Sequence, residues 1–173
     1  MQSIKEMYMK NDTDKKKYFN NSFLSRTDIR LTKWMARNAL SYMRISMGII
    51  FLWYGFLKFF PQLSSAEQIA TKTISVLTFN MVPDRLILIV LALWEVAIGV
   101  GLIFRIFLRE TLLLMFLQML GTLTPLILFP AETFTVFPLV PTLLGQYIIK
   151  NLVIITAGLA IGATARGGKL TAD

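Results

Sequence analysis

The sequence contains no cysteine and no histidine, and these two absences exclude several kinds of chemistry. Without cysteine, the chain forms no disulfide, no CxxC redox motif and no thiolate metal site. Without histidine, it lacks the commonest haem ligand and the usual zinc and copper ligands. We therefore expect no metal site and no covalent cofactor. Any redox chemistry must depend on a bound organic molecule or on a partner protein.

Charged residues are also scarce. They make up 16% of the 173 residues, against roughly 25% in an ordinary soluble domain. Hydrophobic residues make up 55%, and the mean hydropathy is +0.60. This apolar excess is too large for one soluble core and indicates a membrane protein. The net charge of +8 would suggest nucleic acid in a soluble protein, but here we expect no nucleic-acid partner.

The sequence contains long apolar runs with few charged residues. Four stand out, and each is close to the ~20 residues that cross a bilayer as a helix. They cover roughly residues 41–60, 85–104, 110–129 and 146–165. The runs are continuous rather than alternating, which favours helices over the strands of a barrel. The sequence therefore predicts an all-α fold, an integral membrane four-helix bundle over residues 41–165.

The distribution of lysine and arginine predicts the orientation of this bundle. Basic residues are concentrated before residue 45, in the 105–109 loop and in the C-terminal tail, 166–173. The loops at 61–84 and 130–145 carry one lysine and none, respectively. Because segments rich in lysine and arginine lie on the cytoplasmic side of the membrane, we expect the N- and C-termini to be cytoplasmic and these two loops to face outward.

Three segments outside the four apolar runs have predicted structures that differ from one another. Residues 1–27 are predicted to be a basic cytoplasmic tail. Residues 28–40 (DIRLTKWMARNAL) are predicted to form an interfacial amphipathic helix held by anionic headgroups, although a solvated charge run is the alternative. Residues 64–77 begin with a capping box, Ser64 to Glu67, and are predicted to form a short helix on the outer membrane surface.

One lysine, Lys58, stands among apolar residues near the outer end of the first span. A long side chain there can snorkel to the headgroups, which is the simplest interpretation. However, Lys58 ends a helical stripe with steps of four and three residues, formed by Arg44, Gly48, Phe51, Gly55 and Lys58. Glycines allow close helix approach, so the stripe favours an inward-facing Lys58.

The other spans carry matching polar residues. Glu95 lies midway along the second span, and Gln118 lies at similar depth in the third. A carboxyl group at mid-membrane costs about 2.5–3.5 kcal/mol, so Glu95 should be partnered or protonated. Further along the third span, Pro125 frees the carbonyl of Gly121 and is expected to kink the helix.

The depth of each residue suggests which of them pair. At about 1.5 Å per residue, Lys58 lies roughly 12 Å nearer the outer surface than Glu95. If Pro141 occupies the first turn of the fourth helix, Lys150 and its neighbour Asn151 are about level with Glu95. We therefore expect Glu95–Lys150 to be the direct pair, with Lys58 above it. A buried ion pair that only fixes helix register is the structural alternative.

Three stretches carry a family resemblance: RISMGIIFLWYGFLKF (44–59), EVAIGVGL (95–102) and GQYIIKNLVIITAGLAIG (145–162). Over roughly residues 40–170 the chain resembles the DoxX family of small bacterial membrane proteins, including its YkgB-like relatives. The resemblance implies a four-helix fold in the bacterial inner membrane. For some members it implies association with quinone-linked oxidation of sulfur compounds or with oxidative-stress defence. Four candidate residues fall on the matching motifs, namely Lys58, Glu95, Lys150 and Asn151, whereas Gln118 does not.

Three functions remain open, and the sequence does not decide whether the protein is an enzyme. In the first, it is a quinone-interacting subunit of a membrane oxidoreductase that receives electrons from a redox partner protein. Lys58 or Lys150 would then hydrogen-bond a quinone carbonyl, and Glu95 would relay a proton. Tyr54 and Trp94 would flank the ring.

In the second, the protein has no catalytic role and takes part in assembly. Its glycine-lined helix faces would then pack against helices of a partner protein or of another copy of the chain. The third is transport of a small solute. Four short spans without inverted-repeat symmetry argue against a transporter unless the protein oligomerises.

Overall fold

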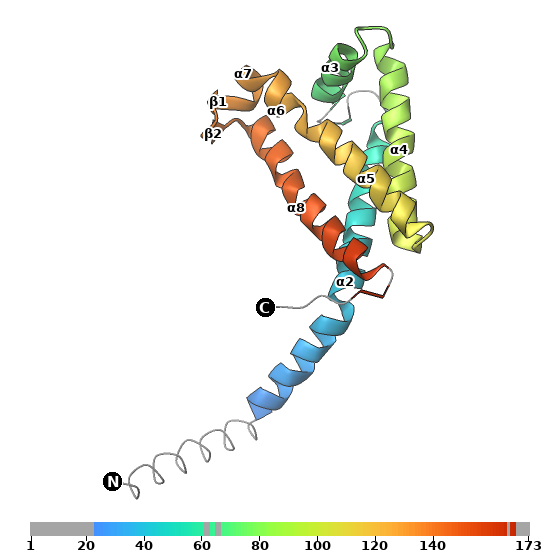
Figure 1. Cartoon of the computed structure of the whole chain (residues 1–173), viewed down its shortest axis with the longest axis vertical. Helices are drawn as coiled ribbons and strands as arrows, with labels where there is room; N and C mark the ends of the chain where they lie inside the picture. The colour runs from blue at the N-terminus through green and yellow to red at the C-terminus, as the bar shows by residue number, and fades with distance from the viewer. Residues whose placement is uncertain (1–22, 61–62, 65–66, 166, 169–173) are drawn as a thin grey trace, which may run out of the picture. The chain divides into compact units, whose positions relative to one another are not determined.

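The computed structural model describes residues 23–60, 63–64, 67–165 and 167–168, and most of these are helical (Figure 1). In chain order the elements are α2 (Phe23–Leu57), α3 (Glu67–Leu77), α4 (Asp84–Phe104), α5 (Leu108–Leu123), α6 (Pro125–Leu128), α7 (Pro130–Thr133), β1 (Phe134–Val136), β2 (Val140–Pro141) and α8 (Leu143–Thr164). Within the described residues, four helical segments are long and apolar enough to cross a membrane. The predicted helical class is confirmed, and the four predicted runs are helices of sufficient length and apolarity, while insertion in a membrane and the orientation of the termini stay predictions. Most of the two predicted tails lies outside the described residues.

The chain divides into two compact units, Met1–Leu40 and Ser41–Asp173. The described part of the first unit is the beginning of α2. Residues 28–40 are helical as predicted, but they belong to one continuous helix, Phe23–Leu57, rather than to a separate helix. Its apolar side chains, including Leu31 and Trp34, are exposed. Contact between this helix and anionic headgroups stays a prediction.

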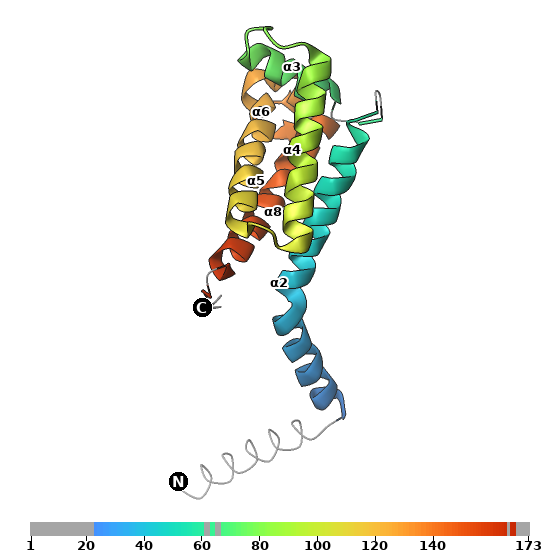
Figure 2. The same ribbon diagram turned by 90° about the vertical axis from the view of Figure 1, so that its right-hand side faces the viewer.

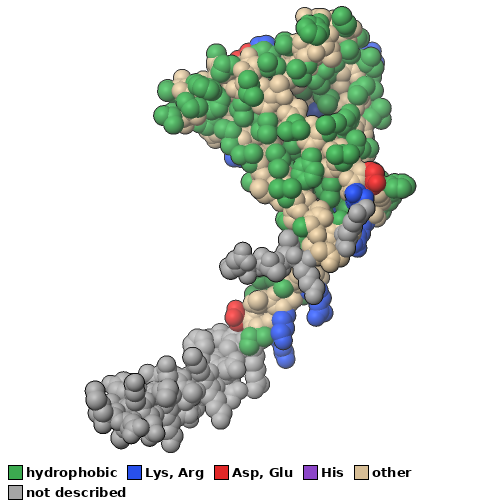
Figure 3. Space-filling model, viewed as in Figure 1, with side chains coloured by type: hydrophobic (Ala, Val, Ile, Leu, Met, Phe, Trp, Pro, Cys, Tyr) green, Lys and Arg blue, Asp and Glu red, His purple; other side chains and the backbone are tan. Residues whose placement is uncertain are grey.

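The second unit is a helical bundle made of α4, α5, α8 and the part of α2 from Ser41 onward (Figures 1 and 2). Its core consists of apolar side chains on the facing stripes of these helices, namely Met47, Phe51, Ile98, Leu102, Leu112, Met115, Met119 and Ile161. Other large apolar side chains are exposed, and Figure 3 shows hydrophobic groups spread over the face of this unit with few charged groups among them. Such a surface is unfavourable in water and is what a lipid-facing bundle requires.

Glycines set the spacing between α2 and α4. A Cβ atom added at Gly48 would lie 2.7 Å from Cγ1 of Ile103, and one added at Gly55 would lie 2.8 Å from Cβ of Glu95. Real Cβ atoms do not approach so closely, so the contact depends on glycine at both positions. The predicted inward orientation of the glycine stripe is confirmed. At the other end of the stripe, Arg44 donates hydrogen bonds to backbone carbonyls near the end of α4.

The third span is interrupted at Pro125, as predicted. Helix α5 ends at Leu123, and α6 begins at Pro125, which has no backbone N–H to donate. The carbonyl of Gly121 accepts instead from the backbone N–H of Thr124, at 3.2 Å. The break between α5 and α6 lies where the third segment contacts α3.

The start of α8 differs from the prediction. Pro141 does not occupy the first helical turn, because it belongs to β2, which pairs antiparallel with β1. The N-cap is Thr142, whose hydroxyl accepts a hydrogen bond from the N–H of Gly145 at 3.2 Å. Threonine is a favourable N-cap because its hydroxyl satisfies a free N–H of the first turn. The short hairpin was not predicted from the sequence.

Helix α3 confirms the short helix predicted at 64–77, with its start at Glu67. It lies at the end of the bundle near α6 (Figures 1 and 2). Lys72 of α3 forms an ion pair with Glu132 of α7 and lies 4.5 Å from the ring centroid of Phe129. These contacts hold α3 against the segment that joins α5 to α8.

Candidate functional site

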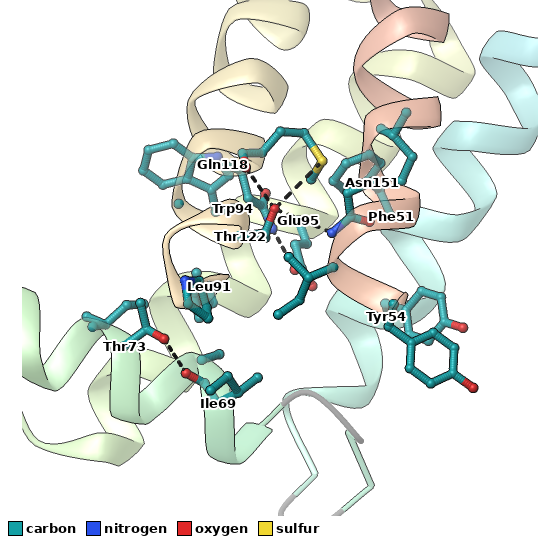
Figure 4. Close-up of a pocket in the computed structure, with 18 of the residues that line it drawn as sticks. Phe51, Tyr54, Ile69, Thr73, Leu91, Trp94, Glu95, Gln118, Thr122 and Asn151 are labelled. Atoms are coloured by element: carbon teal, nitrogen blue, oxygen red, sulfur yellow. Dashed lines mark hydrogen bonds between the residues drawn. The ribbon is translucent and has the colours of Figure 1, made fainter. Parts of the chain in front are cut away.

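Three polar side chains meet inside the bundle: Lys58, Glu95 and Gln118. Each is only 8% exposed, and they come from the turn after α2, from α4 and from α5. The Nζ atom of Lys58 donates to Oε2 of Glu95 at 2.6 Å, and Nε2 of Gln118 donates to Oε1 at 2.6 Å. Figure 4 shows Gln118 directed at Glu95. Both oxygens of the buried carboxylate therefore have a hydrogen-bond donor, as buried charge requires.

The partner of Glu95 is thus Lys58, and the predicted Glu95–Lys150 pair is wrong. Lys58 and Glu95 are separated by roughly 12 Å in depth only if the first two spans are aligned at their midpoints. The contact of Gly55 with Glu95 sets a different register between α2 and α4. Lys58 lies one turn beyond Gly55, to whose carbonyl its own N–H donates at 3.2 Å, so its side chain reaches Glu95. Snorkelling to the headgroups is also ruled out by this burial.

Lys150 takes a different position, on α8. It is exposed, and its Nζ atom lies 5.3 Å from the ring centroid of Tyr147, one turn earlier on the same helix. This is a cation–π distance. Lys150 still borders the cavity described below, but it does so from the edge rather than as the counter-charge of Glu95.

The remaining predicted residues surround the cluster. Asn151 is half-buried, and its Nδ2 lies 3.5 Å from Oγ1 of Thr122, a long hydrogen bond. The indole N–H of Trp94 donates to the carbonyl of Leu114 at 3.2 Å, which holds the ring between α4 and α5. Tyr54 borders the cavity but is exposed, and Figure 4 shows its hydroxyl pointing away from the cluster.

A cavity of about 740 Å³ lies next to the cluster. Lys58, Glu95 and Gln118 are among its polar lining residues, with Thr73, Thr122, Lys150 and Asn151. Its walls are largely apolar and come from α2, α3, α4, α5 and α8, with Ile50, Phe51, Ile69, Leu91, Ile148 and Ile154 among the lining residues. Small-molecule pockets are typically ~300–1,000 Å³, mostly apolar, with a few placed polar groups. The cavity has the size and composition of such a site.

Hydrogen bonding in the cluster is incomplete. The side-chain N–H of Gln118 donates a hydrogen bond to the carboxylate of Glu95. Within the described part of the chain, the buried Oε1 atom of Gln118 has no hydrogen-bond partner. The ammonium of Lys58 has three N–H groups, of which Glu95 uses one. The cluster therefore combines spare N–H donors on Lys58 with a buried, unmatched acceptor on Gln118.

The contribution of α3 to the cavity was missed by sequence reasoning. Ile69, Thr73 and Ile74 of this helix line the cavity, and Thr73 is buried. Figure 4 shows Ile69 and Thr73 on the helix that borders the site. The spacing of these residues on one face of the segment 67–77 is the signal that could have predicted a buried face rather than a wholly membrane-surface helix.

The fold and site together define a class: an apolar helical bundle with four helices long enough to cross a membrane and a polar cluster beside a partly open cavity. No family model, no curated protein and no solved structure matches the chain significantly. The resemblance to the DoxX family stays a prediction from three stretches of sequence.

Proposed function

We propose that the protein is a multi-pass, DoxX-like protein of the bacterial inner membrane that binds a quinone. It would act as a subunit of a membrane oxidoreductase or of an oxidative-stress system. The observation that carries the proposal is the Lys58–Glu95–Gln118 cluster beside an apolar cavity of about 740 Å³. An ion pair that serves only to fix helix register needs no adjacent cavity, so the cavity favours ligand binding over that alternative.

The chemistry of the cavity supports this ligand class. A quinone has a flat apolar body and carbonyl oxygens that accept hydrogen bonds. Lys58 offers N–H donors to a carbonyl oxygen, while the apolar walls and the indole of Trp94 suit the ring. Glu95 lies within hydrogen-bond distance of Lys58 and is the group to take or return a proton there. Electrons would come from a redox partner, since the chain contains no cysteine or histidine.

The glycine contacts bear on the alternative of a non-catalytic assembly protein. That function requires helix faces lined by glycine that are available to pack against a helix of another chain. However, Gly48, Gly55 and Gly99 pack between α2 and α4, and Gly158 packs against Met115 of α5. These faces are used within the chain itself, which weakens the argument for assembly and leaves quinone binding as the better-supported function.

The proposal is tested by what co-purifies with the protein. We expect quinone to be extracted from protein purified in mild detergent, at close to one per chain by mass spectrometry. The variant Lys58→Met should retain much less, because it removes the donor but keeps the side-chain length. Lys33→Met is the matched control, since Lys33 is exposed in the first unit, and it should retain quinone normally. Wild-type protein without quinone would contradict the proposal.

A further inference from the structure

The charged side chains that line the cavity do not balance one another. Among the described lining residues, three carry a charge: Lys58, Glu95 and Lys150. The first two form an ion pair with 2.6 Å between Nζ and Oε2, so their charges cancel. Within the described part of the chain, Lys150 forms no ion pair with a carboxylate. The lining therefore keeps one positive charge, and a cation beside apolar walls is unfavourable unless an anion accompanies it.

Lys150 lies where the cavity reaches the surface of the bundle. Lys150 and Tyr147 both line the cavity, and both are exposed. By contrast, Figure 4 shows the neighbouring Asn151 directed inward, toward Thr122. The Lys150 ammonium lies 5.3 Å from the ring centroid of Tyr147, one turn nearer the start of α8. It therefore leans toward that end of the helix, which is about 10 Å along the axis from residue 150, as a lysine does when it extends to the headgroup level.

The lining that α8 and α2 supply to the cavity is mainly apolar. Its apolar members are Leu144, Ile148 and Ile154 of α8 and Ile50 and Phe51 of α2. A ligand that joins an anion to a hydrocarbon chain gains both from the ammonium and from this apolar lining. A phospholipid has this chemistry, and a bilayer supplies it to a helix that is long and apolar enough to cross a membrane. A soluble anion would use the ammonium alone.

We propose that the edge of the cavity at Lys150 binds an anionic phospholipid, with the lipid phosphate at the Lys150 ammonium and one acyl chain against the apolar lining of α8 and α2. This inference goes beyond the proposed function. It depends on Lys150 at the exposed edge, whereas quinone binding depends on Lys58 inside the bundle. One charge-assisted contact to a phosphate changes a dissociation constant by about tenfold or more.

The test measures binding to the detergent-solubilised full chain by native mass spectrometry. Three probes share the same acyl chains: phosphatidylglycerol, which has a net negative charge, phosphatidylethanolamine, which is zwitterionic, and diacylglycerol, which has no phosphate. The fourth probe is inorganic phosphate, which has no chain. We expect phosphatidylglycerol to bind about tenfold more tightly than the other two lipids, because it alone supplies both a net negative charge and a chain. Inorganic phosphate should not bind at the same concentration.

Substitutions locate the charge that holds the lipid. Lys150→Met should weaken phosphatidylglycerol binding about tenfold, to the level of phosphatidylethanolamine. Lys150→Arg keeps the charge and should bind phosphatidylglycerol as before. Arg85→Met is the matched control, because Arg85 is an exposed cation at the start of α4 that does not line the cavity, and its loss should leave the affinity unchanged. Equal losses in Lys150→Met and Arg85→Met, or no loss in Lys150→Met, would overturn the inference.

The position of the acyl chain is tested on the wild-type chain, so the answer does not depend on whether a variant folds. Phosphatidylglycerol with a photoreactive group on one acyl chain should label Ile148, which lines the cavity and is buried, so that only a chain inside the cavity reaches it. Labelling confined to exposed residues such as Leu152 and Val153 would overturn the inference. Binding of inorganic phosphate as tight as that of phosphatidylglycerol would also overturn it, in favour of a site for a soluble anion. The quinone proposal is tested separately, by Lys58→Met.

Discussion

Gly55 lies directly against Glu95: a Cβ atom at position 55 would come within 2.8 Å of the Glu95 Cβ atom and 2.9 Å of the Val96 nitrogen. This contact sets the register in which α2 meets α4. It also brings Lys58, one turn further along, to the carboxylate. The polar cluster therefore depends on the absence of a side chain at position 55.

Replacement of Gly55 by alanine tests this dependence. The added methyl group must push the two helices apart, so we expect Gly55→Ala to destabilise the protein by about 1–3 kcal/mol, the usual cost of overpacking. The measurement is unfolding in mixed micelles. The matched control is Gly121→Ala, because a Cβ at Gly121 meets nothing within 4 Å, and helix propensity predicts a gain of up to about 1 kcal/mol. Similar effects at the two glycines would show that close packing does not distinguish Gly55.

The Lys58–Glu95 pair is tested by a double-mutant cycle. Glu95→Gln or Lys58→Met alone should destabilise the protein by about 3–5 kcal/mol, because each leaves one buried partner without its counter-charge. The double variant should recover part of that loss. For comparison, the exposed pair Lys72–Glu132 should show a coupling of no more than about 1 kcal/mol. Strict additivity of Lys58→Met and Glu95→Gln would be inconsistent with the pair.

The substitution Lys58→Arg tests whether quinone retention requires the shape of the lysine side chain or only its positive charge. Lys58→Arg keeps the charge, but a planar guanidinium does not fit where a compact ammonium lies 2.6 Å from a carboxylate oxygen. We expect the variant to insert in the membrane and to lose quinone retention. Lys33→Arg, at an exposed position away from the cavity lining, should retain quinone. Normal retention by Lys58→Arg would mean that only charge is needed.

Topology is tested by single cysteines, since the chain has none of its own. The placement of lysine and arginine predicts that cysteines at Gln68 and Thr135 react with an impermeant thiol reagent added to intact cells. A cysteine at Ile106, exposed in the turn between α4 and α5, should react only after the cells are opened. Labelling of position 106 in sealed cells would reverse the orientation.

The spans were predictable from the sequence, whereas the pairing of polar residues was not. The run predicted at 85–104 corresponds to α4, Asp84–Phe104, because a continuous apolar stretch of bilayer length has few other stable structures. Depth along each span could be estimated only by assuming a register. The register is in fact set by glycine contacts such as Gly55 with Glu95, which a sequence does not specify. Gln118 was identified as a candidate, but its bond to Glu95 depends on that same packing.

The central claim is that the cavity beside Lys58, Glu95 and Gln118 is a quinone site. Its most direct test is to photolabel the wild-type chain in membranes with a photoreactive quinone and map the modified residues by mass spectrometry. We predict labelling of cavity-lining residues such as Trp94 and Ile148, and its loss when unlabelled quinone competes. Labelling confined to outward-facing residues such as Trp53 and Val153, and insensitive to competition, would contradict the account.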